Sequence, residues 1–318
     1  MGLINAHLMH SVEPVLETIK VTSAELIGHK KFESFRVSTK RQYKNFELTS
    51  QKLNQEIGAH LQSVCNKPVK LKGADLNVVI ELVNGRAYIG VDKIQGYGGL
   101  PVGTGENAIS LISSGIDSPV SSFEMIKRGV SLSYVHFHSA PATSRQSIKN
   151  VKRLLEIIAG YQIKCMLYNI PLLAIQEKIM ETAPSKFWVI LFRRAMMKMA
   201  EKIAENINAV ALITGENVGQ VASQTLSNMR ATADAVELPI IRPLAGMNKE
   251  DIINRAREIG TYDVSIEPYE DCCSFFVPIH PETRAKLDEV RAIESSINMN
   301  KLYQTAMENL EQIIIEGK

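Results

Sequence analysis

A run of small and polar residues that follows an apolar stretch is the part of this chain best suited to chemistry. Residues 108–112 are mostly apolar and predict a buried strand, residues 113–115 are small, and Ser118 and Pro119 predict the start of a helix. Ser118 can cap this helix, and proline suits its first position, where the missing N–H would have no partner in any case. Backbone N–H groups of such a strand, loop and helix converge on one point, and this geometry binds phosphate or pyrophosphate.

The segment 113–118 resembles the Ser-Gly-Gly-x-Asp-Ser pyrophosphate loop of the ATP pyrophosphatase superfamily. It is not a Walker A loop, because no Gly-Lys-Ser/Thr follows. The resemblance implies a loop that holds the β and γ phosphates of ATP as a leaving group while a substrate oxygen takes the AMP. The alternative is an ordinary serine-rich turn. The expected phosphate contacts are Ser113, Ser114, Gly115 and Ser118.

Two other strand ends carry residues that a nucleotide could contact, since ligands of parallel sheets bind beyond the carboxyl ends of the strands. His136 and Phe137 end a predicted strand, where they could pack on adenine and hydrogen-bond it through backbone groups. The alternative for His136 is a structural histidine. Gly215 permits close approach of the backbone to a ligand, and Glu216 could hold Mg²⁺ or a ribose hydroxyl.

Two predicted helices add further candidates. Arg193 and Arg194 lie in an otherwise apolar helix, where paired arginines need anionic partners such as phosphates. The alternative for this pair is an internal salt bridge. Gln220 and Gln224 are four residues apart in the helix expected over 218–228, so they would share one face. The alternative here is a polar helix start with solvated glutamines.

The four cysteines divide into two kinds. Cys65 ends an amphipathic stretch and Cys165 lies in an alternating strand, so both are expected to be packing residues. Cys272 and Cys273 are adjacent in a polar segment, and neighbouring cysteines do not readily close a relaxed disulfide with each other. At least one of them is a candidate reactive thiol, the alternative being two inert buried thiols. No spacing typical of a zinc site is present, and beyond the Mg²⁺ that Glu216 could hold with a nucleotide, no metal site is predicted.

Charge is unevenly distributed along the 318 residues, although the net charge is only +2. Residues 1–95 hold 13 Lys and Arg against 9 Asp and Glu, a net of +4. A basic N-terminal module suggests a polyanionic partner, most simply nucleic acid, and the alternative is a solvated basic face. No apolar run approaches the roughly 20 residues that span a bilayer, and no cleavable signal is evident. We therefore expect a cytoplasmic protein without membrane contact.

Apolar periodicity predicts two different architectures on either side of a linker. The N-terminal part predicts helices over 12–28 and 49–64 and strands over 35–39, 76–83 and 86–92, with Asn84-Gly85 as a hairpin turn. Five glycines between 96 and 106 mark the linker. Beyond it, strands (107–112, 130–137, 162–170, 209–214, 238–242) alternate with helices (118–128, 144–159, 186–206, 218–228, 248–259). This alternation predicts an α/β fold with a doubly wound, mainly parallel sheet. Residues 282–315 are expected to be helical, packed outside or against a partner subunit.

These pieces, in this order, resemble the tRNA 4-thiouridine synthetase family, the tRNA sulfurtransferases of the ATP pyrophosphatase superfamily. The most specific motifs are Gly-Glu-x-x-Gly-Gln-Val-Ala-Ser-Gln-Thr from Gly215, Arg242-Pro-Leu, and Pro-Tyr-Glu-Asp-Cys-Cys ending at Cys273. The resemblance implies a ferredoxin-like remnant over 1–30, a small α+β THUMP RNA-binding domain over 31–95, a linker over 96–106, an adenine nucleotide alpha hydrolase-like domain over 107–281, and a C-terminal helical segment over 282–318.

The resemblance also assigns roles. Asp117 is implied to be catalytic, and the sulfur-handling cysteine falls on Cys272 with Cys273 as a helper. The implied ATP contacts are Leu111, Ile112, His136, Phe137, Arg193, Gly215 and Gln224. Ser114 stands where the family usually has glycine. The expected RNA contacts are Arg36, Lys40, Arg41 and Lys44.

The predicted activity follows from these roles. With ATP and Mg²⁺, a tRNA uridine would be adenylated at its C4 oxygen and then receive sulfur, giving 4-thiouridine, AMP and pyrophosphate. We expect no rhodanese-like domain after the C-terminal segment, so sulfur is expected directly from a cysteine desulfurase persulfide, another persulfide, or sulfide. A homodimer is expected, and a role in thiamine thiazole synthesis is open. The alternatives are a tRNA-binding protein with a degenerate nucleotide site and an amidating enzyme that uses ammonia.

Overall fold

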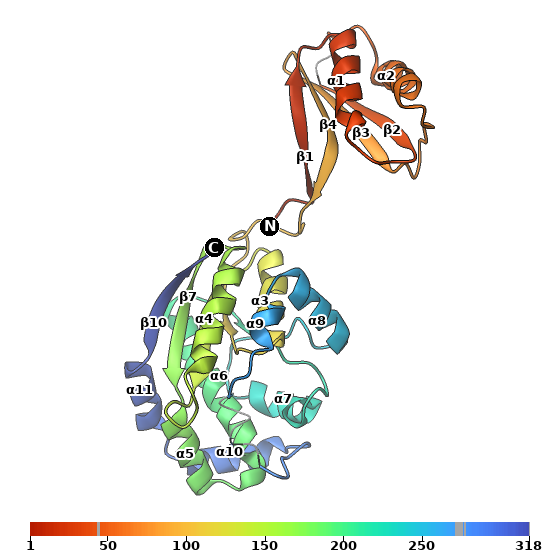
Figure 1. Ribbon diagram of the computed structural model, residues 1–318. Helices are drawn as coiled ribbons and strands as arrows, with labels where there is room; N and C mark the ends of the chain where they lie inside the picture. Colours follow the sequence, from red (N-terminus) through yellow and green to blue (C-terminus); the bar gives the residue numbers. More distant parts are fainter. Residues whose placement is uncertain (43–44, 271–275, 277, 318) are drawn as a thin grey trace. The chain divides into compact units, whose positions relative to one another are not determined.

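The computed structural model describes residues 1–42, 45–270, 276 and 278–317. It divides into two compact units (Figure 1): Leu3–Gly98 forms one, and Gly99–Lys318 with Met1–Gly2 forms the other. Cys272, Cys273 and Lys44 lie outside the described residues.

The smaller unit is a four-stranded sheet with two helices on one face (Figure 1). Its strand order is β1-β4-β3-β2, with β2 and β3 parallel and the other pairs antiparallel. Buried side chains of both helices, such as Ile19 and Leu53, pack against the buried strand residues Phe35 and Ile80. The elements are β1 (Asn5–Val12), α1 (Leu16–Gly28), β2 (Phe35–Arg41), α2 (Ser50–Cys65), β3 (Leu76–Val83) and β4 (Arg86–Gln95).

Local signals in this unit behave as predicted. Asn84 and Gly85 have φ values of 49° and 72°, the left-handed conformation that a tight hairpin turn requires. The side chain of Thr49 accepts a hydrogen bond from the N–H of Lys52 and so caps α2. The strand β1 was not expected, and it pairs with β4 along the sheet edge. Residues 3–30, which the resemblance assigns to a ferredoxin-like remnant, therefore belong to the same compact unit as residues 31–95.

The larger unit contains a six-stranded sheet in the order β10-β7-β6-β5-β8-β9, with only β10 antiparallel to its neighbour. From β5 the chain proceeds outward to β6 and β7, and it then returns to the other side of β5 for β8 and β9. The sheet therefore has its switch point at β5 and β8, where a crevice is expected. The strands are β5 (Asn107–Leu111), β6 (Ser131–His138), β7 (Lys164–Pro171), β8 (Leu212–Ile213), β9 (Ile240–Ile241) and β10 (Glu311–Glu316).

Alternating strand residues enter two separate cores, one on each face of this sheet. Ala108 and Tyr134 face a core shared with α3, α4 and α8, whereas Ile109 and Val135 face a core shared with α5, α6 and α10. The predicted doubly wound α/β fold is thus confirmed. The helices are α3 (Asp117–Lys127), α4 (Gln146–Ala159), α5 (Leu173–Thr182), α6 (Trp188–Asn206), α7 (Leu226–Ala233), α8 (Lys249–Glu258), α9 (Tyr262–Ser265), α10 (Leu287–Ser296) and α11 (Asn300–Glu308), with short 3₁₀ turns η1 (Ser185–Phe187) and η2 (Ala222–Gln224).

Two element predictions in this unit were wrong. The helix expected over 218–228 begins only at Leu226, because Gly219 has a φ of +77° and Thr225 caps α7 by accepting from the N–H of Asn228. The C-terminal segment is not wholly helical. Its last part forms β10, whose run of three isoleucines suits a strand beside β7.

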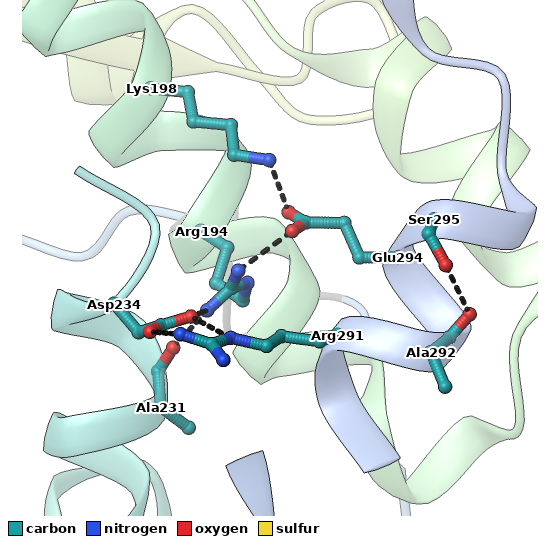
Figure 2. Close-up of polar contacts among 8 residues, drawn as sticks. All are labelled: Arg194, Lys198, Ala231, Asp234, Arg291, Ala292, Glu294 and Ser295. Carbon is teal, nitrogen blue, oxygen red and sulfur yellow. Dashed lines mark hydrogen bonds and ion pairs between the residues drawn. The ribbon is translucent and has the colours of Figure 1, made fainter. Parts of the chain in front are cut away.

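A partly buried charge cluster around the buried Arg194 joins α6, the end of α7 and α10 (Figure 2). Arg194 lies 3.2 Å from Asp234 and 2.7 Å from Glu294, which also pairs with Lys198 at 2.9 Å. Arg291 donates to Asp234 from the exposed side. Burial alone would raise the pKa of Glu294, but hydrogen bonds from Arg194 and Lys198 outweigh it and lower that pKa. Arg194 therefore has the internal salt bridge that the sequence left open as an alternative.

Candidate active site

A cavity of about 560 Å³ opens at the carboxyl ends of β5, β6 and β8. It brings together residues that lie more than 100 positions apart in the chain. The predicted ligand residues that line it are Leu111, Ile112, Ser113, Gly115, Asp117, Ser118, His136, Phe137, Arg193, Gly215 and Gln224. The remaining predicted contact, Ser114, is not among the lining residues.

The Ser118 side chain does not cap α3 as expected. Instead it joins the two ends of the 113–118 loop by hydrogen bonds. The helix begins at Asp117, one residue earlier than predicted. The Ser118 hydroxyl accepts from the N–H of Ser113 at 2.9 Å and donates to the Ser113 carbonyl at 3.1 Å. The side chain thus ties the two ends of the loop together. The first N–H groups of a helix have no intrahelical acceptor, so the start of α3 suits an anion in the cavity.

Ser114 is not among the residues that line the cavity, and it is fully buried. Its hydroxyl has no hydrogen-bond partner among the described residues. It is also absent from the residues with a positive φ, so its backbone conformation does not require glycine. Serine at this position therefore leaves the cavity unobstructed, and the phosphate contact expected of Ser114 stays a prediction.

Gly215 allows one backbone to approach another. A Cβ atom at this position would lie 2.8 Å from the amide nitrogen of Ser118 and 2.9 Å from the carbonyl carbon of Asp117. Such contacts are shorter than side-chain atoms tolerate, so glycine is needed to pack the end of β8 against the start of α3. Besides the close approach of a ligand expected from the sequence, this glycine therefore has a packing role in the cavity wall.

Asp117 is held at the cavity by two side chains from different segments. Lys249 Nζ lies 2.5 Å from one carboxylate oxygen, and the Gln220 amide donates to the other at 2.9 Å. Lys249 begins α8, far from the loop in sequence. Sequence reasoning missed it because a lone lysine in a helix first turn, beside Glu250 and Asp251, is ordinary. Lys249 and Asp117 thus place one cation and one carboxylate at the end of the 113–118 loop, which suits phosphate binding.

Glu216 is a buried carboxylate shared between two arginines. It lies 3.1 Å from Arg193 and 2.6 Å from Arg242, and Thr214 donates to it at 3.0 Å. Burial acts to raise its pKa, but the charges of Arg193 and Arg242 outweigh burial and lower the pKa. The carboxylate thus pairs with both arginines, and because its Oε1 has no hydrogen-bond partner among the described residues and Glu216 lines the cavity, the expected Mg²⁺ or ribose contact stays a prediction. Arg193 therefore lines the cavity, and its guanidinium group is held there by the ion pair with Glu216.

His136 presents an unpaired ring nitrogen. Its Nδ1 lies 2.9 Å from the Ile112 carbonyl, which only accepts, so Nδ1 carries the proton. Its Nε2 is buried with no partner among the described residues. Burial lowers the pKa of His136 from 6.5 to about 4, so the ring is neutral near pH 7. Since His136 lines the cavity, Nε2 offers an acceptor to a ligand N–H.

The expected RNA contacts of the smaller unit are not equivalent. Arg36 and Lys40 are exposed, and Lys40 lies 3.9 Å from Glu81. Arg41 is half-buried and donates to the carbonyls of Phe46 and Leu48. Arg41 therefore stabilises its own loop, whereas Arg36 and Lys40 carry exposed charges that a polyanion could reach.

The cysteines that the structure describes are packing residues, as predicted. Cys165 is buried, and burial raises its pKa to about 12, so the thiol stays protonated. Cys65 is half-buried at the end of α2 and packs on the core of the smaller unit. Within the described ranges, no cluster of three or more His, Cys, Asp or Glu side chains could hold a metal ion. No helix in the same part of the chain is long and apolar enough to cross a membrane.

The fold and the cavity define a doubly wound α/β nucleotide-binding protein with a loop suited to phosphates. Residues 103–299 match the family model described as thiamine biosynthesis protein (ThiI), and residues 16–92 match the THUMP domain. The chain belongs to the ThiI family.

Curated relatives match almost the full chain. It is 40% identical over 320 residues to a "Probable tRNA sulfurtransferase" of Bacillus pumilus, covering 100% of this chain and 80% of that protein. It is also 40% identical over 311 residues to a protein of the same name from Thermus thermophilus, covering 98% and 77%.

Solved structures agree with these matches. A 4-thiouridine synthetase in complex with RNA and with bound ATP is 35% identical to this chain, with a TM-score of 0.91, covering 98% of this chain and 83% of that one. PH1313 from Pyrococcus horikoshii shares the fold at 23% identity, with a TM-score of 0.57 and coverage of 82% and 78%.

Gly215→Ala should weaken ligand binding through the backbone. The added methyl must displace the start of α3, so we expect the Kd for Mg-ATP to rise by about tenfold, roughly 1.4 kcal/mol. Gly246→Ala is the matched control, since no atom lies within 4 Å of its Cβ position. Isothermal titration with both variants checks this. Equal affinities for Gly215→Ala and wild type would contradict the packing role.

His136→Asn should flatten the pH dependence of stability. The unfolded histidine takes up a proton below pH 6.5 and the folded one only near pH 4, so the stability that it contributes is lost as pH falls between these values. A shift of that size corresponds to about 3 kcal/mol. Urea unfolding from pH 7 to pH 4 should show wild type losing that much more than the variant. Parallel curves would mean that His136 titrates normally.

Proposed function

We propose that this chain is an ATP-dependent tRNA sulfurtransferase that converts a uridine of tRNA, position 8 by resemblance, to 4-thiouridine, releasing AMP and pyrophosphate. The observation that carries the proposal is the cavity that joins the 113–118 loop, Asp117 and His136, in a chain similar to an ATP-bound 4-thiouridine synthetase–RNA complex. Relatives named tRNA sulfurtransferase share 40% identity with nearly all of it.

The cavity suits ATP in size and in the chemistry of its walls. Its volume falls in the range of about 300–1,000 Å³ typical of small-molecule sites. The 113–118 loop and the first N–H groups of α3 would hold the β and γ phosphates. The buried Nε2 of His136 would accept from the base, beside Phe137. These two regions lie at the ends of neighbouring strands, β5 and β6.

Mg²⁺ would be held mainly by the phosphates. The described residues offer no cluster of three ligating side chains, and Glu216 is engaged by two arginines. Asp117 is the carboxylate of the loop itself, at the start of α3, and its ion pair with Lys249 would lie beside the phosphates. When bound, the ion supplies neutralisation of the charge that develops on the leaving pyrophosphate.

The proposed reaction has two displacements. The C4 oxygen of the uridine attacks the α-phosphate of ATP, and the bond to pyrophosphate breaks. A sulfide, or the terminal sulfur of a persulfide on Cys272 or Cys273, then attacks C4 and displaces AMP. In the persulfide case a second thiol cleaves the S–S bond and leaves sulfur on C4. That thiol ends in a disulfide with the cysteine, and an external thiol reductant then restores both thiols.

The partners are proposed on the same grounds. tRNA is the substrate, and the exposed Arg36 and Lys40 of the smaller unit are the proposed contacts, together with Lys44 from the sequence alone. A cysteine desulfurase or another persulfide or sulfide source supplies sulfur, and a homodimer is the proposed assembly. The cytoplasmic location and a role in thiamine thiazole synthesis stay predictions.

The test is turnover of unmodified tRNA with Mg-ATP and a persulfide donor, followed by mass spectrometry of nucleotides and tRNA. AMP and 4-thiouridine should form in equal amounts. Asp117→Asn should lower both by at least about a hundredfold, because the carboxylate beside the loop is lost. Cys272→Ser or Cys273→Ser should abolish thiolation, whereas Cys65→Ser, a packing cysteine, should not.

Other outcomes of this experiment would indicate a different function. ADP in place of AMP would exclude adenylation. AMP formation with ammonia and an aminated uridine product would favour the amidating alternative. Tight tRNA binding without nucleotide turnover would indicate an RNA-binding protein with a degenerate site.

A further inference from the structure

The N-terminus of α7 joins two separate walls of the cavity. One wall is formed by η2, whose residues Ala222, Ser223 and Gln224 line the cavity. The other is formed by Pro281 and Glu282, from the segment that follows the cysteine pair in sequence. The structure connects these two walls through side chains that do not themselves line the cavity.

Asn228 makes the central connection. It is fully buried, and its amide nitrogen donates to the Ala222 carbonyl at 2.9 Å and to the Glu282 carbonyl at 2.7 Å. Its amide oxygen accepts from the N–H of Ala285 at 3.1 Å. One side chain therefore satisfies three backbone groups from both walls, and its loss would leave buried polar groups without partners.

Thr225 reinforces this connection from the preceding turn. Its hydroxyl donates to the Thr283 carbonyl at 2.7 Å and accepts from the N–H of Asn228 at 3.2 Å. A single hydroxyl thus caps α7 and holds the second wall. Lys186 approaches the same wall from η1, since the Glu282 N–H donates to its carbonyl at 2.9 Å.

The other end of α7 is attached to the same C-terminal segment by charge. Asp234, just after α7, pairs with Arg291 of α10 and with Arg194 (Figure 2). Neither Asp234 nor Arg291 lines the cavity. The helix therefore carries two attachments of different kinds, one at the cavity and one away from it.

We infer that Thr225 and Asn228 are positioning residues for ATP, which fix Pro281 and Glu282 in the cavity wall. The inference rests on the proposed function, because it takes ATP as the ligand. The attachment through Asp234 and Arg291 stabilises the fold without setting the shape of the cavity. Changes at the cavity end of α7 should therefore alter ligand affinity, whereas changes at its other end should alter the stability of the fold.

The test compares variants at the two ends of α7 in the full chain. The readouts are the Kd for Mg-ATP by isothermal titration and the thermal unfolding midpoint. Asn228→Ala should raise the Kd by about tenfold, and Thr225→Val by about threefold. Thr225→Ser keeps the hydroxyl and should bind like wild type. Arg291→Gln should lower the unfolding midpoint and leave the Kd within about twofold, and Ser227→Ala, exposed on the same helix, should change neither.

The outcomes decide between the two roles. Wild-type affinity in Asn228→Ala, or a Kd that rises in Arg291→Gln as much as in Asn228→Ala, would overturn the inference. If Asn228→Ala does not fold, Thr225→Val against Thr225→Ser decides in its place. Should wild type make AMP and 4-thiouridine while these variants bind normally, only this inference fails. Should wild type not bind Mg-ATP, the proposed function fails as well.

Discussion

The buried carboxylate of Glu216 is the interaction on which the candidate site depends. It comes after Thr214 and Gly215 at the end of β8, and it is paired with Arg193 from α6 and Arg242 from the segment after β9. A buried charge that loses one partner costs several kcal/mol, so these three segments are fixed relative to one another. The adjacent Gly215 lets the same strand end touch the start of α3. The loop, the arginine and the strand end therefore form one rigid edge of the sheet.

The sequence predicted much of this arrangement, because the signals involved are local. Apolar alternation identified the parallel strands, and Asn84-Gly85 identified the hairpin, since each depends on near neighbours in the chain. That the predicted nucleotide contacts meet at one edge of the sheet followed from the geometry of parallel sheets. The prediction of a helix over 218–228 was wrong because Gly219 adopts a left-handed conformation, which the spacing of apolar residues does not reveal.

What sequence could not predict depends on tertiary partners. Lys249 faces Asp117 across 132 positions, and Asn228 reaches carbonyls from two loops, so neither role has a local signature. Arg193 and Arg194 look equivalent in sequence, yet one lines the cavity and the other lies within an ion cluster (Figure 2). Ser114 is expected to be a ligand from its motif, yet its side chain is buried and is not among the residues that line the cavity, and local sequence does not reveal this.

The central claim is that the uridine C4 oxygen attacks the α-phosphate of ATP. The most direct test uses tRNA whose target uridine carries ¹⁸O at C4, with Mg-ATP and a persulfide donor. Because sulfur displaces AMP by breaking the C4–O bond, the account predicts that the released AMP carries one ¹⁸O atom for each 4-thiouridine formed. Unlabelled AMP, with 4-thiouridine still produced, would contradict it.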